Sequence, residues 1–305
     1  MKHSRSCIKT LLFGLGFIAL PTLAHADAWS FTATPNTTQG TYSSSQQRST
    51  FADYGIGISA DYLDQGGIQV SYSNTLIGET SGLTNINQNN YMVSGHLNFH
   101  PDALPGQVTV RLDDYVIDNN YQNTSIQQPN YDPTSRSNVV ATQISWLNND
   151  KTLYADLGYA NSPYQGFTVQ QYTPTFGFAF DQAYDWLQLR GYMISGLQAS
   201  TAGKTSTNAL ETKWTHFFVS QSAWVPSSVT VGITLGEQDY AVNMDAQQVA
   251  NLADLSQGAD TIGLNWNLSK STKLFVLGGQ SRFRYVAGAN DYQLNFGYAG
   301  LTYAW

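Results

Sequence analysis

The sequence is poor in charge, nearly free of cysteine, and without a long apolar run after its first 26 residues. Charged residues make up 11% of the 305 residues, against about 25% in an ordinary soluble domain. The single cysteine, Cys7, excludes a disulfide scaffold, and only 14 Lys and Arg exclude a nucleic-acid binder. A membrane-spanning helix needs about 18 apolar residues in succession, and no such window follows residue 26. An aromatic content of 13% argues against a disordered chain.

The N-terminus has the three parts of an export signal. Lys2, Arg5 and Lys9 form a basic region, residues 10–23 are largely apolar, and residues 24–26 read Ala-His-Ala. We therefore predict a cleaved signal peptide over residues 1–26 and a single domain over residues 27–305. Cleavage removes three of the 14 basic residues and none of the 21 acidic ones, which leaves an acidic chain.

After residue 26 the apolar residues alternate with small or polar ones. In residues 54–58, for example, Tyr54, Ile56 and Ile58 alternate with Gly55 and Gly57. The same period of two recurs near residues 68–73, 91–99, 229–235 and 261–268. A period of two with one apolar and one polar face is typical of strands between lipid and a wet lumen. The pattern predicts an all-β fold, a transmembrane antiparallel up-and-down β-barrel.

Turn signals between these segments give the strand count. We expect fourteen strands near residues 29–35, 51–63, 67–77, 89–100, 106–118, 137–147, 152–161, 167–180, 185–196, 209–220, 228–237, 260–268, 273–285 and 291–305. Connections after even-numbered strands are short. Those after odd-numbered strands are mostly long and polar, notably 36–50, 119–136 and 238–259. A count of twelve would result if the first or the weakly patterned ninth segment were miscounted. Short turns on one side and long loops on the other are typical of bacterial outer-membrane barrels.

The C-terminus separates this fold from a water-soluble β-sandwich, which also shows alternation. Tyr298, Gly300, Tyr303 and Trp305 occupy the spacing of an aromatic residue, a glycine and two final aromatics. This resembles the C-terminal β-signal of Gram-negative outer-membrane β-barrel proteins, porin-like channels among them, and indicates no narrower family. The resemblance implies a location in the outer membrane, contact with its lipid, and recognition by the barrel-assembly machinery.

Catalytic and metal-binding patterns are not evident. The three histidines after residue 26 (His96, His100 and His216) have no serine two residues later, so the arrangement of outer-membrane phospholipases is missing. We expect no enzyme, no catalytic residue and no cofactor. The long segment 238–259 contains Asp239, Asp245 and Asp254, which would suit either a solvated acidic loop or a surface Ca²⁺ site. Within it, residues 244–255 have helical spacing and suggest a short helix over or inside the barrel mouth.

The period of two assigns a set of charged side chains to the inner face. They are His96, Arg111, Asp113, Asp156, Arg190, Glu211, Lys213 and Arg282. Counting back from the hairpin turns places His96 opposite Arg111, and Arg190 close to Glu211 and Lys213. Two charged clusters should therefore point into the lumen. Each would be either a constriction that filters solutes or a salt-bridged plug that stiffens the wall.

Fourteen strands enclose more space than small inward residues can fill. We therefore expect a monomeric passive diffusion channel for small hydrophilic solutes. The alternative is a surface-interaction barrel, an adhesin or anchor, with a blocked lumen.

Overall fold

The computed structural model describes residues 28–80, 85–121, 136–164, 166–198, 203–219, 222–252, 254–285 and 290–305. The predicted signal peptide lies outside these residues, as does most of the loop predicted over residues 119–136. Among the described residues, no helix has the length and apolarity needed to cross a membrane.

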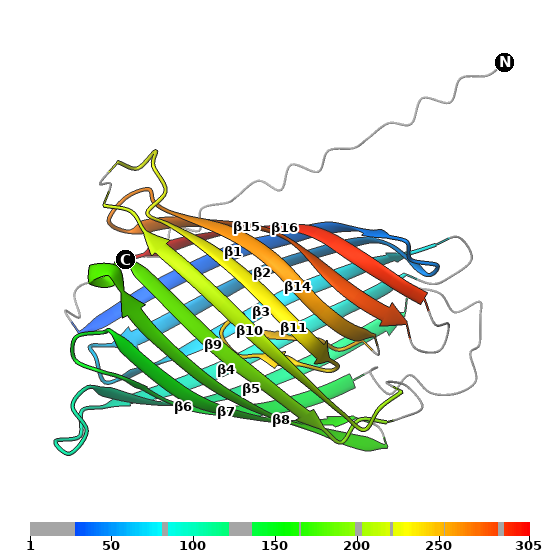
Figure 1. Cartoon of the computed structure of the whole chain (residues 1–305), viewed down its shortest axis with the longest axis horizontal. Helices are drawn as coiled ribbons and strands as arrows, with labels where there is room; N and C mark the ends of the chain where they lie inside the picture. The colour runs from blue at the N-terminus through cyan, green and yellow to red at the C-terminus, as the bar shows by residue number, and fades with distance from the viewer. Residues whose placement is uncertain are drawn as a thin grey trace.

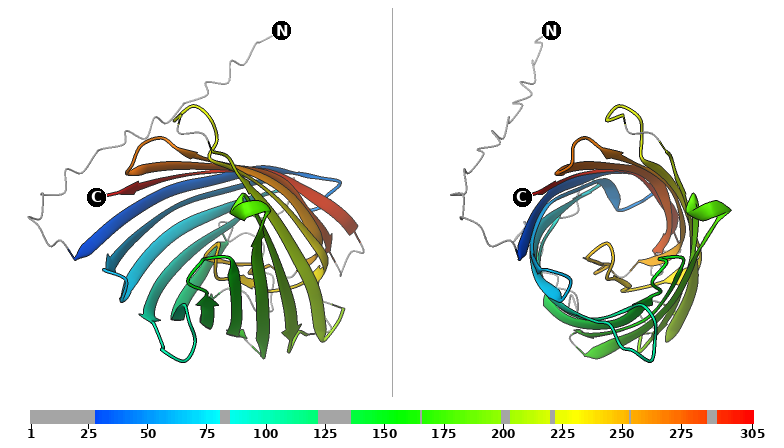
Figure 2. Two further views of the ribbon diagram at one scale, coloured as in Figure 1. Left: turned by 60° about the vertical axis from the view of Figure 1, so that its left-hand side comes forward. Right: turned by 90° about the vertical axis from the view of Figure 1, so that its left-hand side faces the viewer.

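Fourteen strands form one closed antiparallel barrel, shown from the side in Figure 1 and along its axis in Figure 2. The strands of the wall are β1 (Trp29–Ser43), β2 (Arg48–Tyr62), β3 (Gly66–Glu79), β4 (Ile86–Phe99), β5 (Gln107–Tyr121), β6 (Arg136–Leu147), β7 (Leu153–Tyr164), β8 (Phe167–Phe180), β9 (Asp185–Ser195), β10 (Ser206–Phe217), β11 (Ser228–Gln238), β14 (Leu255–Asn267), β15 (Thr272–Tyr285) and β16 (Asn290–Ala304). A short 3-10 turn, η1 (Asp181–Ala183), connects β8 to β9. Each strand pairs with its neighbours in sequence, and β1 pairs with β16 to close the ring. The predicted fold class and strand count are confirmed.

The main difference from the predicted boundaries is at the start of the barrel. β1 continues to Ser43, so residues 36–43 are wall and not loop, and only a short turn leads to β2. Thr and Asn dominate this part of β1 and weaken the apolar alternation that marks a strand.

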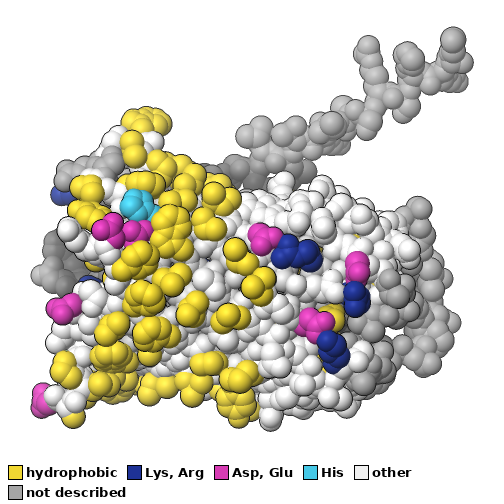
Figure 3. Space-filling model, viewed as in Figure 1, with side chains coloured by type: hydrophobic (Ala, Val, Ile, Leu, Met, Phe, Trp, Pro, Cys, Tyr) yellow, Lys and Arg dark blue, Asp and Glu magenta, His cyan; other side chains and the backbone are white. Residues whose placement is uncertain are grey.

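The outer surface carries an apolar belt over half of the barrel's length (Figure 3). Ile58, Val70 and Val93 are 45%, 49% and 60% exposed on neighbouring strands, as expected for side chains in contact with lipid. Paired aromatic rings mark the two edges of the belt. Trp29 and Tyr62 lie 5.0 Å apart at the end where β1 begins and β16 ends, and Tyr72 and Tyr91 lie 5.2 Å apart toward the other end.

Beyond the second aromatic edge the outer surface is polar and carries ion pairs (Figure 3). Arg282 contacts Asp260 at 2.6 Å, and Arg284 contacts Asp291 at 2.7 Å. A membrane-spanning strand needs about 9–11 residues, whereas most strands here have 11–15. The additional length continues the barrel beyond the lipid as a polar collar.

A short hairpin within residues 239–254 leaves the wall between β11 and β14 and enters the lumen (Figure 2). Its strands are β12 (Val242–Asn243) and β13 (Gln248–Val249). We call residues 239–254 the inward loop. The predicted helix over residues 244–255 is wrong, because the described residues there form this hairpin. Contacts with the barrel wall override the local helical spacing.

Candidate functional site

The inward loop turns into the barrel because both flanking strands are irregular at its base. The β11–β14 register shifts between Leu235 and Gln238. Gly236 and Gly258, on the two sides of this shift, have φ of 102° and 122°, a region that favours glycine. Such bulges bend a strand and redirect the chain that follows.

Apolar contacts fix the loop against one side of the inner wall. Val242 and Met244 are buried in a cluster with inward residues of β4–β7, namely Met92, Tyr115, Ile117, Val139, Ala141 and Ala160. Gly158 on β7 leaves room for Met244, since a methyl group at Gly158 would lie 2.8 Å from the Met244 Cε. At the base of the loop, Tyr240 packs with Tyr164 and Phe167 in a second cluster. This half of the lumen is therefore filled by side chains.

Polar contacts hold the loop at several further points. The Gln171 side chain on β8 donates to the Val242 carbonyl at 2.7 Å and accepts from the Val242 N–H at 2.9 Å. Gln247 at the tip exchanges amide hydrogen bonds of 2.8 and 3.0 Å with Gln69 on β3. At the far end of the loop, Asp254 forms an ion pair with Arg48 at the start of β2. The loop thus bridges strands on opposite sides of the ring.

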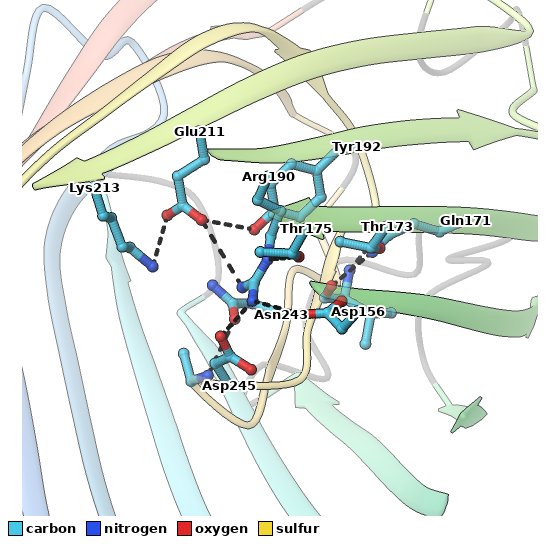
Figure 4. Close-up of polar contacts among 12 residues, drawn as sticks. Asp156, Gln171, Thr173, Thr175, Arg190, Tyr192, Glu211, Lys213, Asn243 and Asp245 are labelled. Atoms are coloured by element: carbon cyan, nitrogen blue, oxygen red, sulfur yellow. Dashed lines mark hydrogen bonds and ion pairs between the residues drawn. The ribbon is translucent and has the colours of Figure 1, made fainter. Parts of the chain in front are cut away.

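Arg190 on β9 is the centre of the polar contacts drawn in Figure 4. It is 3% exposed, forms an ion pair with Asp245 of the inward loop, and donates from Nε to the Thr175 hydroxyl at 3.0 Å. Its guanidinium nitrogens also lie 3.9 Å from Glu211 and 4.0 Å from Asp156. Lys213 contacts the same Glu211 at 3.0 Å.

A second charged cluster lies on β2, β4 and β5. Arg111 contacts Asp113 at 2.7 Å, and the Tyr115 hydroxyl donates to Asp113 at 3.0 Å. His96 pairs in register with Arg111 and lies 3.6 Å from Asp61. Seven of the eight charged residues predicted to be inward thus occupy the inner face, in the two clusters expected from hairpin counting.

The eighth residue, Arg282, is a correction, because it lies on the outer face. It pairs in register with Gln293, on the same face of the wall as Leu301 and Trp305, and its partner Asp260 is also external. On β15 the residues from Leu274 to Leu277 are apolar on both faces, so a period of two cannot decide which face is inner.

The C-terminal residues close the ring. Tyr303 and Trp305 point outward and are 50% and 47% exposed, whereas Tyr298 and Gly300 share the inner face. The Trp305 N–H donates to the Phe31 carbonyl at 3.1 Å, and its ring stacks on Phe31 at 6.0 Å. These contacts join the last residue to the first strand.

The three acidic residues of the inward loop do not gather around one point. Asp245 lies at Arg190, whereas Asp254 lies at Arg48. Asp239 is 1% exposed at the base of the loop, and burial together with the charge of Asp254 raises its pKa to about 8. No group of three or more His, Cys, Asp and Glu within the described ranges is arranged to hold a metal ion. The alternative of a surface Ca²⁺ site, raised beside a solvated acidic loop, is therefore not supported by these residues.

Sequence reasoning missed the residues that position the loop. Gln171 and Gln69 are uncharged residues on otherwise ordinary strands, and only the inward path of the loop gives them partners. Arg48 was predicted to lie in a loop, whereas it begins β2. Extending the period of two on β2 backward would have placed Arg48 on the outer face, because the irregularity between Arg48 and Thr50 is what turns it inward.

Comparisons with known proteins bear on the fold. No family model matches the chain, and none of the curated proteins matches its sequence. Among solved structures, the TodX deltaS2S3 mutant, described as a monoaromatic hydrocarbon channel, matches with a TM-score of 0.55 at 8% identity, covering 92% of this chain and 91% of that one. The chain has an outer-membrane β-barrel fold. At this identity the likeness shows the fold alone.

Two further structures are similar over most of their length but superpose less well. The Acinetobacter baumannii outer membrane protein Omp33 matches with a TM-score of 0.47 at 7% identity, covering 90% of this chain and 99% of that one. The KdgM porin matches with a TM-score of 0.37 at 10% identity, covering 88% and 98%. The fold assignment therefore relies on the first comparison and on the closed ring itself.

Proposed function

We propose that this barrel is a passive diffusion channel for small hydrophilic solutes in the outer membrane. The observation that carries the proposal is the inner surface of β14, β15, β16, β1 and β2, away from the packed side of the inward loop. On β14, β1 and β2 its side chains are mostly small or polar, including Thr34, Asn36, Gly55, Thr261 and Gly263, whereas β15 and β16 also contribute larger apolar and aromatic side chains. A ring of eight strands is nearly filled by side chains, whereas sixteen strands leave a channel. Fourteen strands with small inner residues on β14, β1 and β2 leave room for water beside the loop.

In this proposal the inward loop sets the width of the channel. Its tip contacts Gln69 and Arg190, which lie at the level of the lipid-facing residues Val70 and Leu189. The passage is then bounded by the loop on one side and by β14–β2 on the other. The charged residues around Arg190 act as part of a constriction and at the same time hold the loop in place.

The lumen carries more carboxylates than cations. The acidic groups on the inner face and on the inward loop are Asp53, Asp61, Asp113, Asp156, Glu211, Asp245 and Asp254, while Asp239 keeps its proton at neutral pH because burial raises its pKa to about 8. The facing cations are Arg48, Arg111, Arg190 and Lys213, with Lys273 at the end where β1 begins and β16 ends. An acidic passage concentrates cations over about one Debye length. We therefore expect a modest cation preference at low salt that weakens toward 1 M salt.

Planar-bilayer recording on the purified chain tests the proposal. Stepwise conductance, with a reversal potential of cation-selective sign under a KCl gradient, is the expected result. Anion selectivity at low salt, or the absence of any conductance, would overturn it. Lys213→Gln should strengthen the cation preference, because the Lys213 side chain is 31% exposed in the lumen and otherwise repels cations.

The second candidate is a surface-interaction barrel with a blocked lumen. It is favoured by the apolar packing of Val242 and Met244, which is closer to a protein core than to a water-filled wall. A bilayer that contains correctly inserted protein but shows no ionic conductance would favour this candidate. We further propose a monomer with no enzymatic activity, exported after removal of residues 1–26 and inserted by the barrel-assembly machinery through Tyr298, Gly300, Tyr303 and Trp305.

A further inference from the structure

Three aromatic rings lie against the inner wall on the side opposite the packed part of the inward loop. Phe275 on β15 lies over Gly263, where a methyl group would be 2.8 Å from the Phe275 Cε2. Phe296 on β16 lies over Gly279 in the same way, at 2.9 Å from its Cζ. Because glycine has no side chain, each ring can approach the strand backbone closely.

Tyr298 joins the two phenylalanines into one row. Its ring lies over Gly300, with the hydroxyl 2.6 Å from the position of a methyl group there, and its centroid is 5.7 Å from that of Phe275. Phe296 and Tyr298 are two residues apart on one strand face, a spacing of about 7 Å. All three side chains are only half-buried. We call Phe275, Phe296 and Tyr298 the aromatic track.

The contacts described for the tip of the inward loop do not involve the aromatic track. The contacts of Val242, Met244, Asp245 and Gln247 given above are with residues on β3–β9. Figure 2 shows the loop projecting into the ring from β11 and β14 across the lumen, and β15, β16 and β1 follow β14 around the ring. Solutes passing beside the loop would therefore meet the track.

The surroundings of the track are mostly polar and uncharged, with Asp53 on β2 next to Thr38, the register partner of Tyr298. Asn36 on β1 pairs in register with Gly300, and Thr34 and Thr302 hydroxyls are 3.1 Å apart on the same side. Thr261 and Asn265 follow on β14, beside Gly279 and Phe275. Among the described inner-face residues of β14, β15, β16 and β1, the one charged side chain is Lys273, next to Phe275 on β15. The passage thus combines ring faces with hydroxyl and amide groups.

We propose that the aromatic track binds uncharged carbohydrate and makes the channel selective for it. The inference rests on the proposed function, because the track would be useful only to a solute passing through the lumen. A pyranose has an apolar face of C–H groups that packs on an aromatic ring, and an edge of hydroxyls that needs hydrogen-bond partners. Asn36, Thr34 and Thr261 offer those partners.

Other classes of solute fit this surface less well. An apolar hydrocarbon would take the flanking amides and hydroxyls out of water without replacing their hydrogen bonds, at a cost in free energy. A charged sugar acid would meet one cation, Lys273, at the end of the track, and would be repelled by Asp53 and by the other acidic residues of the lumen. The row of three rings also suits a linear chain of sugars better than a single one.

The test uses maltohexaose, a linear uncharged glucan, with the purified full barrel. Two readouts are needed: interruption of single-channel current, and calorimetric binding in detergent, which does not depend on conduction. We expect maltohexaose to interrupt the wild-type current. Phe275→Ala and Phe296→Ala should each weaken its binding about tenfold. Tyr298→Phe keeps the ring and should change binding by less than threefold. Phe176→Ala removes a lipid-facing ring that is 49% exposed on β8 and should leave binding unchanged.

The outcomes separate the two proposals. A conducting channel that neither binds maltohexaose nor is interrupted by it would overturn the carbohydrate track and leave the channel intact. A barrel that binds maltohexaose without conducting would overturn the channel and support the track as a binding site. Equal binding by wild type and by both alanine variants, or tighter binding of benzyl alcohol than of the glucan, would also overturn the proposal.

Discussion

Asp245, at the tip of the inward loop, forms an ion pair with Arg190, a wall residue that is 3% exposed on β9. This contact ties the loop to the inner wall of the barrel. Arg190 keeps Glu211, Asp156 and Thr175 as neighbours if the loop moves away, whereas Asp245 would pass into water. Arg190 therefore stays in place on the wall when the contact breaks, and Asp245 moves away together with the loop.

Asp245→Asn should loosen the tip of the loop and leave the barrel folded. The Asp245 side chain is 45% exposed, so we expect a cost of about 1 kcal/mol, in the range of solvent-screened ion pairs. That corresponds to a roughly fivefold rise in the population of the released loop. Single-channel recording should show more frequent transitions to a larger current. Glu237→Gln, which removes a pair with Lys204 at the outer rim, is the control and should leave the current unchanged.

The inward position of the loop should weaken as the pH rises. The pKa of Asp239 is raised to about 8, first by burial and then by the charge of Asp254, against 3.8 when the loop is released. Between these two pH values Asp239 keeps its proton in the packed loop but has lost it in the released loop. The stability of the packed position therefore declines from about pH 4 to about pH 8 and does not change further above pH 8. Burial raises the pKa of Asp254 as well, although Arg48 opposes the shift.

Amide hydrogen exchange of the inward loop, corrected for the intrinsic rate, measures this dependence. Protection should be greater at pH 5 than at pH 8.5. Asp239→Asn should remove most of the difference, since the neutral amide cannot ionise. Equal protection of the wild type at both pH values would contradict the prediction.

The lipid belt predicts that arginine substitutions at two neighbouring residues of β2 destabilise the barrel to very different extents. Ile58 is 45% exposed on the outer face, and Ser59 lies on the inner face beside Thr32 and Asp61. Ile58→Arg should cost about 2–4 kcal/mol near the bilayer midplane, whereas Ser59→Arg should cost much less because its side chain reaches water. Refolding into vesicles under a urea gradient measures both. Similar costs would mean that the lumen is dry at this level.

The last residue should be needed for closure. Trp305→Ser removes the stacking on Phe31 and weakens the signal by which assembly is initiated. An open edge leaves backbone groups unpaired in lipid at several kcal/mol each. We expect little heat-modifiable, membrane-inserted protein from this variant. Val219→Ser, which changes a residue that is 76% exposed near the end of β10, should insert normally.

Much of this architecture was predictable from the sequence, and the reasons are local. Two-residue alternation and turn signals are properties of single strands, so the number of wall strands and the pairing of His96 with Arg111 followed from counting. The path of the inward loop was not predictable, because its contacts with Gln69 and Gln171 are between residues far apart in sequence. Arg282 was misplaced because the neighbouring segment of β15 is apolar on both faces, and a one-residue change of face moves every side chain across the wall.

The central claim is that water passes beside the inward loop along β14–β2 and not through the packed side. The only cysteine of the chain, Cys7, lies in the predicted signal peptide, so single cysteines introduced into the barrel report their own surroundings. Asn36→Cys places a thiol on the inner face of β1, and Ala141→Cys places one in the apolar cluster, where Ala141 is 0% exposed. A water-soluble, positively charged thiosulfonate should reduce the current of Asn36→Cys within minutes and leave Ala141→Cys unaffected. Reaction at Ala141→Cys with none at Asn36→Cys would contradict the account.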